Sequence, residues 1–176
     1  PDRPAETRDL VRRGLQADML LLSGGVSMGK HDLVEAALAE AGAEIVITEV
    51  KIQPGKPLVF ALAGDRPVFG LPGNPVSTMV TFELFARPAL EILAGIERPA
   101  LPFLQAPLAK PFRHKPVLTR FLPARFVGEY AASRVEPIQW QGSGDLAATA
   151  RADCFLVAPE GRESWEAGEP IGVLPL

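Results

Sequence analysis

The sequence predicts an α/β fold: a three-layer α/β domain over residues 1–98 that lacks its first strand, then a small all-β, barrel-like domain over residues 99–176. Three observations lead to this prediction. Helical and strand-like patterns alternate up to residue 98, two glycine-containing loops join strands to helices there, and ten of the 18 prolines fall after residue 98.

The first two predicted pairs of elements are a helix followed by a strand. A helix over 4–16 has Pro4 in its first turn and leads into a short apolar strand at 18–23, which we expect to be buried in a parallel sheet. A helix over 32–41, with Gly42 directly after it, precedes a β-branched strand at 44–50. Because a helix that feeds a buried strand implies an earlier neighbouring strand, we expect the α/β domain to be cut at its N-terminus.

A hairpin and a long helix complete this domain. Two apolar runs at 58–62 and 67–71 flank a Gly-Asp turn and predict the hairpin. Asn74-Pro75 then begins a helix over about 75–94 that Gly95 ends. Apolar residues surround much of this helix, so it is expected to be largely buried: Met79, Val80, Phe82, Leu84, Phe85, Leu90, Ile92 and Leu93.

After residue 98 the pattern predicts β structure without a long helix. Short apolar runs at 117–127, 135–140, 154–158 and 171–174 are separated by turn residues. We therefore expect a small β domain of barrel or sandwich type.

Composition excludes several classes of protein. A formal net charge of −3 with no basic field does not suggest a nucleic-acid-binding protein. No apolar run approaches the ~18–20 residues of a membrane helix, so no membrane partner is expected. The single cysteine, Cys154, cannot form an internal disulfide and is interpreted as a core residue in a cytoplasmic setting; His114 is interpreted as a surface residue.

The loop over residues 23–32, SGGVSMGKHD, is the first candidate site. It follows a strand and enters a helix, where backbone N–H groups and the helix dipole favour an anion. Two interpretations stay open: a phosphate-binding loop, or glycines that only make a tight turn. Asp32 likewise is either a structural N-cap or a carboxylate that holds Mg²⁺ beside a phosphate.

Two further loops have similar chemistry. In Gln53-Pro54-Gly55-Lys56-Pro57 the prolines stiffen the chain around Lys56. Lys56 either binds an anion or is a solvated surface lysine. The loop over 70–77, GLPGNPVS, again joins a strand to a helix start. If these strands share a sheet, all three loops lie along one edge, where an extended anionic ligand fits.

Two features of the β domain are less specific. Residues 101–140 carry six Lys or Arg against two Glu, which is interpreted as a solvated strand face rather than a binding surface. The turn over 140–145, WQGSGD, is polar and glycine-rich but not diagnostic.

In this order, SGGVSMGKHD, QPGKPLVFA and GLPGNPVSTMVTFELFARPAL resemble the molybdopterin molybdenumtransferase family, which includes the catalytic half of gephyrin. The resemblance covers residues 1–98 strongly, and 99–176 looks like the family's small C-terminal domain. It implies that molybdate is inserted into adenylylated molybdopterin with release of AMP, that Mg²⁺ is required, and that the chain is the C-terminal fragment of a homodimeric parent. A molybdopterin adenylyltransferase is an implied partner.

The resemblance also implies roles for the matching residues. Asp32 would be the metal-binding and catalytic carboxylate, and Lys56 would supply positive charge. The substrate-binding residues would be Ser23, Gly24, Gly25, Val26, Ser27, Gly29, Pro54, Gly55, Pro72, Gly73, Asn74, Pro75 and Ser77.

Two departures from the family bear on activity. Some members have lysine at the positions of Gln53 and Glu49, so the site is less basic here. The family's STGDEL-like loop and its N-terminal domains would precede Pro1, so the fragment alone is expected to be inactive. The rival hypotheses are a non-catalytic scaffold or partner-binding module of the same fold, and a nucleotide hydrolase or adenylyltransferase with a TGGxG loop, which this chain lacks.

Overall fold

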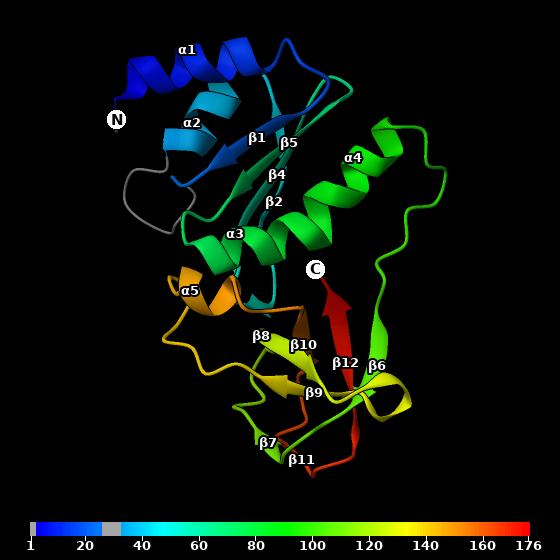
Figure 1. Cartoon of the computed structure of the whole chain (residues 1–176). Coiled ribbons are helices and arrows are strands. Elements are labelled where there is room, and N and C mark those ends of the chain that lie inside the picture. The colour runs from blue at the N-terminus through cyan, green and yellow to red at the C-terminus, as the bar shows by residue number, and fades with distance from the viewer. Residues whose placement is uncertain (1–2, 26–32) are drawn as a thin grey trace. The chain divides into compact units, whose positions relative to one another are not determined.

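The computed structural model describes residues 3–25 and 33–176, and the chain divides into two compact units (Figure 1). The first unit comprises residues 1–50 and 55–99, and the second comprises 51–54 and 100–176. A division at residue 98 alone would place 51–54 with the first unit. The structure groups them with the second unit because β3 (Ile52–Gln53) pairs in parallel with β8 (Thr119–Val127).

The first unit is built on a four-stranded mixed sheet in the order β1-β5-β4-β2. Its strands are β1 (Leu20–Ser23), β5 (Arg66–Leu71), β4 (Pro57–Ala63) and β2 (Glu44–Glu49). β1 and β5 are parallel, whereas β4 is antiparallel to both β5 and β2. The predicted hairpin is confirmed, with Ala63 paired to Arg66 across a two-residue turn.

Helices cover both faces of this sheet (Figure 1). α1 (Pro4–Gly14) and α2 (Leu33–Glu40) pack on the face that carries Val59 and Ala61 of β4. The opposite face carries Leu58, and the long helix covers it. Because side chains alternate along a strand, β4 contributes to both clusters. The result is the predicted three-layer α/β arrangement.

The long helix has three consecutive parts: α3 (Pro75–Thr81), the π-helical turn η1 (Phe82–Ala86) and α4 (Arg87–Leu93). Pro88 lies one residue into α4 and has no N–H to donate to the preceding turn. Single π-helical turns occur inside longer α-helices, and both a proline and such a turn are recognised causes of a helix kink.

The predicted burial of this helix is wrong at its C-terminal end. Leu90, Ile92 and Leu93 are 38%, 58% and 48% exposed. Only one side of the helix packs against the sheet. In this part of the helix, that side contributes Phe82, Phe85, Ala86 and Ala89 to the core. Apolar composition had indicated burial all round, but a helix on one face of a sheet needs only that side to be apolar.

The strand β1 is also less buried than expected. It is an outermost strand of the described sheet, with a neighbouring strand on one side only. Its residues alternate between half-buried and exposed, and Leu21 is 40% exposed. The helix ends follow the prediction, because Gly42 and Gly95 adopt φ of +79° and +91° directly after their helices.

The second unit contains a six-stranded sheet in the order β3-β8-β10-β12-β6, with β9 paired to β8. A bridge between Leu108 and Val135 links the chain after β6 to β9, so the two ends of the sheet approach each other. Closure into a barrel stays a prediction. Its remaining elements are β6 (Leu104–Pro107), β7 (Phe112–Arg113), η2 (Tyr130–Ala132), β9 (Arg134–Pro137), α5 (Leu146–Thr149), β10 (Cys154–Ala158), β11 (Ser164–Trp165) and β12 (Pro170–Pro175).

His114 is buried, which corrects its interpretation as a surface residue. It is 7% exposed, and its Nε2 lies 2.7 Å from the carbonyl oxygen of Arg162. Its ring stacks on Phe112 and contacts Trp165, next to the two-stranded β7–β11 sheet. The short β7 strand turns this side chain toward the aromatic cluster, a placement that the sequence around it did not indicate.

Cys154 is a core residue, as predicted. It has no exposed surface and begins β10 at the centre of the second unit's sheet. In the described part of the chain, no helix is long and apolar enough to cross a lipid bilayer.

Burial raises the pKa of the Cys154 thiol to about 12, with a smaller contribution from the neighbouring Asp153 carboxylate. We therefore expect the folded chain to react only slowly with an aromatic disulfide reagent at pH 8, because the thiolate is the reactive form. Absorbance of the released thiolate should report one thiol promptly after unfolding in guanidinium chloride. A prompt reaction of the folded chain would contradict the placement of β10.

Candidate functional site

The first candidate site lies where the parallel strands β1 and β5 end side by side. Ser23, the last residue of β1, is in register with Leu71, the last residue of β5. The pairing continues one residue further, because the Gly24 N–H donates to the Leu71 carbonyl at 3.0 Å. The structure therefore brings together the starts of the loops that follow these two strands.

Glycines allow these two loops to approach each other closely. A Cβ atom added to Gly73 would lie 3.4 Å from the Gly24 Cα. Gly24 and Gly25 have φ of +85° and +72°, values that residues with a side chain rarely adopt. At Gly25, a Cβ atom would also lie only 3.1 Å from the Val34 side chain. The geometry of the tight turn is thus enough to explain these glycines. Phosphate binding by this loop therefore stays a prediction.

The rest of the first loop falls outside the described residues. This applies to the predicted site residues Val26, Ser27, Gly29 and Asp32. His31 also lies there.

The loop after β5 turns directly into the long helix. Asn74 occupies the N-cap position with an extended backbone, and Pro75 is the first helical residue. Gly73 and Asn74 are exposed, whereas Pro72 and Ser77 are buried. Of these predicted pocket residues, Gly73 and Asn74 are therefore open to solvent, whereas Pro72 and Ser77 lie inside the fold.

Thr78 holds this turn and was missed by the sequence analysis. Its hydroxyl lies within hydrogen-bonding distance of the Pro72 carbonyl and, at 3.0 Å, of the Asn74 carbonyl. A threonine four residues after an N-cap commonly bonds back to the preceding turn, and that spacing is the signal that could have identified it.

Lys56 lies at the same edge of the sheet. It directly precedes β4, whose first residues run beside the end of β5, since Val59 pairs with Gly70. All three predicted loops thus reach one edge, as the sequence analysis expected. The Lys56 Nζ lies 3.2 Å from the Glu49 carboxylate, and both side chains are about half exposed. Such an exposed pair contributes about 1 kcal/mol or less, so an incoming anion can displace Glu49 at little cost.

The second candidate site is in the second unit. Gln53 of β3 is the register partner of Arg120 in β8, and Pro54 beside it is buried. The Nε of Arg120 is buried, and no hydrogen-bond partner for it exists in residues 3–25 and 33–176. A buried donor without a partner costs about 1–3 kcal/mol, and a bound anion would satisfy it. The sequence analysis counted Arg120 among the basic residues of a solvated strand face; its place beside Gln53 follows from strand pairing, not from spacing along the chain.

The described residues offer no ready-made metal site. Within residues 3–25 and 33–176, no three His, Cys, Asp or Glu side chains lie close enough together to hold a metal ion. Mg²⁺ usually needs only one or two carboxylates together with phosphate oxygens. The predicted ligand, Asp32, lies outside the described residues.

Comparison with known families finds two models that match in chain order. One is described as "Probable molybdopterin binding domain" and matches residues 1–92. The other is described as "MoeA C-terminal region (domain IV)" and matches residues 105–176. The two matches fall on the α/β and β parts of the chain.

Individual curated proteins that are similar to this chain are named molybdopterin molybdenumtransferases. The chain is 31% identical over 159 residues to the molybdopterin molybdenumtransferase of Bacillus subtilis, covering 90% of this chain and 37% of that protein. It is 32% identical over 178 residues to that of Haemophilus influenzae, covering 99% and 44%. It therefore spans about two fifths of the length of these curated relatives.

Solved structures are similar as well. The molybdopterin biosynthesis MoeA protein from Pyrococcus horikoshii aligns with a TM-score of 0.77 at 31% identity, covering 96% of this chain and 40% of that one. A molybdenum cofactor biosynthesis protein from Pyrococcus furiosus shares the fold, with a TM-score of 0.64 at 22% identity; 95% of this chain and 51% of that one are covered.

The role of Thr78 can be tested by an isosteric change. Thr78→Val removes the hydroxyl and leaves the buried Pro72 carbonyl without this donor, so we expect a loss of about 1–2 kcal/mol in the free energy of unfolding. Urea unfolding followed by circular dichroism measures it. Thr78→Ser keeps the donor and should lose less; equal losses in both variants would show that the methyl group, not the hydroxyl, holds the turn.

Proposed function

The chain belongs to the molybdopterin molybdenumtransferase family, and on that premise we propose that it carries the site at which molybdate is inserted into adenylylated molybdopterin, with release of AMP. The observation that best supports this is the meeting of the loops after β1 and β5 at one sheet edge, beside Lys56. Open α/β sheets bind phosphate-bearing ligands at such edges.

Each loop of the first unit has a proposed task. The loop that begins Ser23-Gly24-Gly25 and continues through Val26, Ser27 and Gly29 would hold the pyrophosphate of the substrate on its backbone N–H groups. Lys56 would neutralise part of the charge that develops as AMP leaves. The exposed Gly73-Asn74 turn would form the wall beside which molybdate meets the dithiolene sulfurs.

Within the second unit itself, Gln53 and Arg120 would offer an anion a polar contact and a positive charge. The unpartnered Nε of Arg120 supports a role for this residue in binding an anion. Arginine suits oxyanions because its planar guanidinium donates two parallel hydrogen bonds.

Mg²⁺ is proposed as the metal, with Asp32 as its protein ligand and phosphate oxygens completing its coordination. When bound, the ion would supply charge neutralisation at the pyrophosphate.

We further propose that the active species is a longer polypeptide that works as a cytoplasmic homodimer and receives its substrate from a molybdopterin adenylyltransferase. The length of the relatives, of which this chain covers about two fifths, supports the longer polypeptide. The chain alone would then be inactive.

Asp32→Ala tests the proposed function directly. In the full-length protein we expect molybdate-dependent AMP release to fall about 100-fold or more, because a metal-binding or acid–base carboxylate contributes that much. Asp65→Ala, in the exposed hairpin turn, is the matched control and should leave the rate unchanged. An unchanged rate in Asp32→Ala would overturn the assignment, and a full-length protein without activity would favour the scaffold alternative.

The ion pair between Glu49 and Lys56 gives a second test. Glu49→Gln releases Lys56, so we expect the KM for adenylylated molybdopterin to fall about two- to fivefold at low salt, with less effect at high salt. Glu44→Gln, at the far end of β2, removes the same charge away from Lys56 and serves as the control. Equal effects of the two variants would show that only net charge matters.

A further inference from the structure

The second unit contains a hollow of about 810 Å³ that the proposed reaction does not use. Its walls come from the segment after β6, from β8 and β9, and from the WQGSGD turn and the end of α5. The volume lies within the range of about 300–1,000 Å³ that small-molecule sites occupy. Neither Gln53 nor Arg120 lines it.

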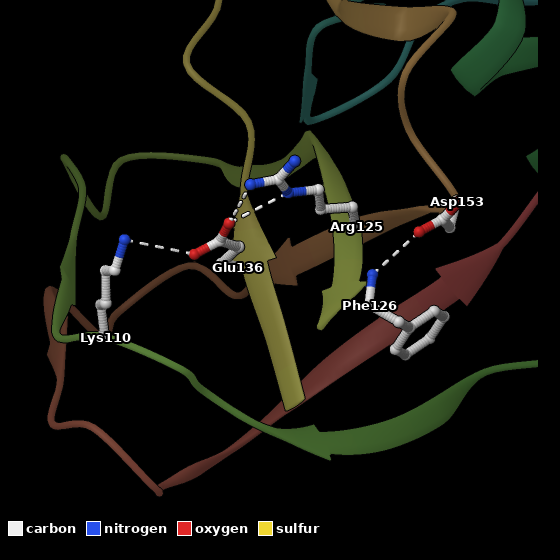
Figure 2. Close-up of polar contacts among 5 residues, drawn as sticks. All are labelled: Lys110, Arg125, Phe126, Glu136 and Asp153. Atoms are coloured by element: carbon white, nitrogen blue, oxygen red, sulfur yellow. Dashed lines mark hydrogen bonds and ion pairs between the residues drawn. The ribbon is translucent and has the colours of Figure 1, made fainter. Parts of the chain in front are cut away.

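Two cations converge on one carboxylate in this hollow. Figure 2 shows Arg125 and Lys110 on either side of Glu136. One oxygen of Glu136 accepts hydrogen bonds from Arg125 Nε at 3.0 Å and Nη2 at 2.6 Å, and the other lies 3.4 Å from Lys110 Nζ. These contacts lower the pKa of Glu136, those with Arg125 most strongly and then those with Lys110, so the three groups together carry one positive charge near neutral pH.

The backbone on both sides of Arg125 is fixed. The Phe126 N–H donates to the Asp153 carboxylate at 2.9 Å (Figure 2), and the Asp153 N–H donates to the Ala124 carbonyl at 2.9 Å. Arg125 is therefore held between two anchored residues, with its guanidinium oriented by Glu136. The hydrogen bonds of Arg125 to other described residues come from its Nε and Nη2, which leaves Nη1 to donate to a ligand.

Arg151 adds another cation to the lining of the hollow. Its Nε donates to the Ala147 carbonyl at 3.2 Å, and its charge also acts on Asp145. The Asp145 carboxylate, which also lines the hollow, accepts hydrogen bonds from the backbone N–H groups of Gln141 and Ala148 at 3.0 and 2.9 Å. These bonds lower the pKa of Asp145, that from Ala148 most strongly, and Asp145 serves as the cap of α5.

Trp140 supplies a flat wall beside these cations. It is partly buried and packs against the hydrophobic core of the second unit, which limits its motion. A fixed indole next to arginine side chains matches a ligand that carries both a planar ring and an anionic group.

We propose that this hollow binds a small phosphate ester that carries a planar ring, with the phosphate on Arg125 and Arg151 and the ring against Trp140. Lys110 adds charge at the rim. None of these residues belongs to the loops to which the molybdenum chemistry is assigned.

Uridine 5′-monophosphate, uridine and inorganic phosphate are suitable probes, titrated into the chain while tryptophan fluorescence is followed. Both tryptophans of the chain lie in the second unit, so the signal reports binding there. We expect saturable quenching by the nucleotide, and at least about tenfold weaker binding of uridine and of phosphate alone. Equal binding of phosphate and nucleotide would overturn the role of the ring, and no saturable quenching in the millimolar range would overturn the site.

Charge variants distinguish binding in this hollow from non-specific electrostatic attraction of the nucleotide to the protein surface. Arg125→Gln should weaken nucleotide binding about tenfold, and Glu136→Gln, which frees both cations, should strengthen it severalfold. Arg134→Gln removes a charge from β9 outside the hollow and should change the affinity less than about twofold. If Arg134→Gln weakens binding as much as Arg125→Gln, or if Glu136→Gln does not strengthen it, the proposed site is wrong.

Discussion

The parallel pairing of β1 with β5 is the constraint on which the first unit's candidate site depends. It puts the ends of two strands in register, and the Gly24 N–H to Leu71 carbonyl bond carries that register into the loops. Helix packing on both faces fixes the sheet, and the hairpin then delivers Lys56 to the same edge. A ligand bound here, as proposed, would meet the Gly24 backbone and the Lys56 ammonium, both of which the described sheet positions.

The cations at the candidate sites are paired with nearby carboxylates, so they do not form a continuous basic surface. Lys56 is paired with Glu49, and Arg125 and Lys110 share Glu136. Each pair lies at a surface where an anion can compete for the cation. The buried Nε of Arg120 is different, since no described group satisfies it. Anion binding at the exposed pairs should therefore weaken as the salt concentration rises, and binding at the buried Arg120 Nε should weaken less.

Local rules predicted much of the fold, whereas contacts between distant segments did not follow from them. The hairpin and the helix ends at Gly42 and Gly95 depend on neighbouring residues only, and they are confirmed. Arg120 beside Gln53 depends on the pairing of two segments far apart in the sequence. The exposure of Ile92 depends on which face of a helix meets the sheet, which apolar composition does not specify. In the site, the shared sheet edge was predictable, but the Glu49–Lys56 contact was not.

Hydrogen exchange of the full-length protein, followed by mass spectrometry with and without adenylylated molybdopterin, tests the central claim most directly. If the loops after β1 and β5 form one binding site, peptides covering residues 20–33 and 70–80 should both gain protection at the same ligand concentration. Protection of neither peptide, or of only one of them at saturating ligand, would contradict the account.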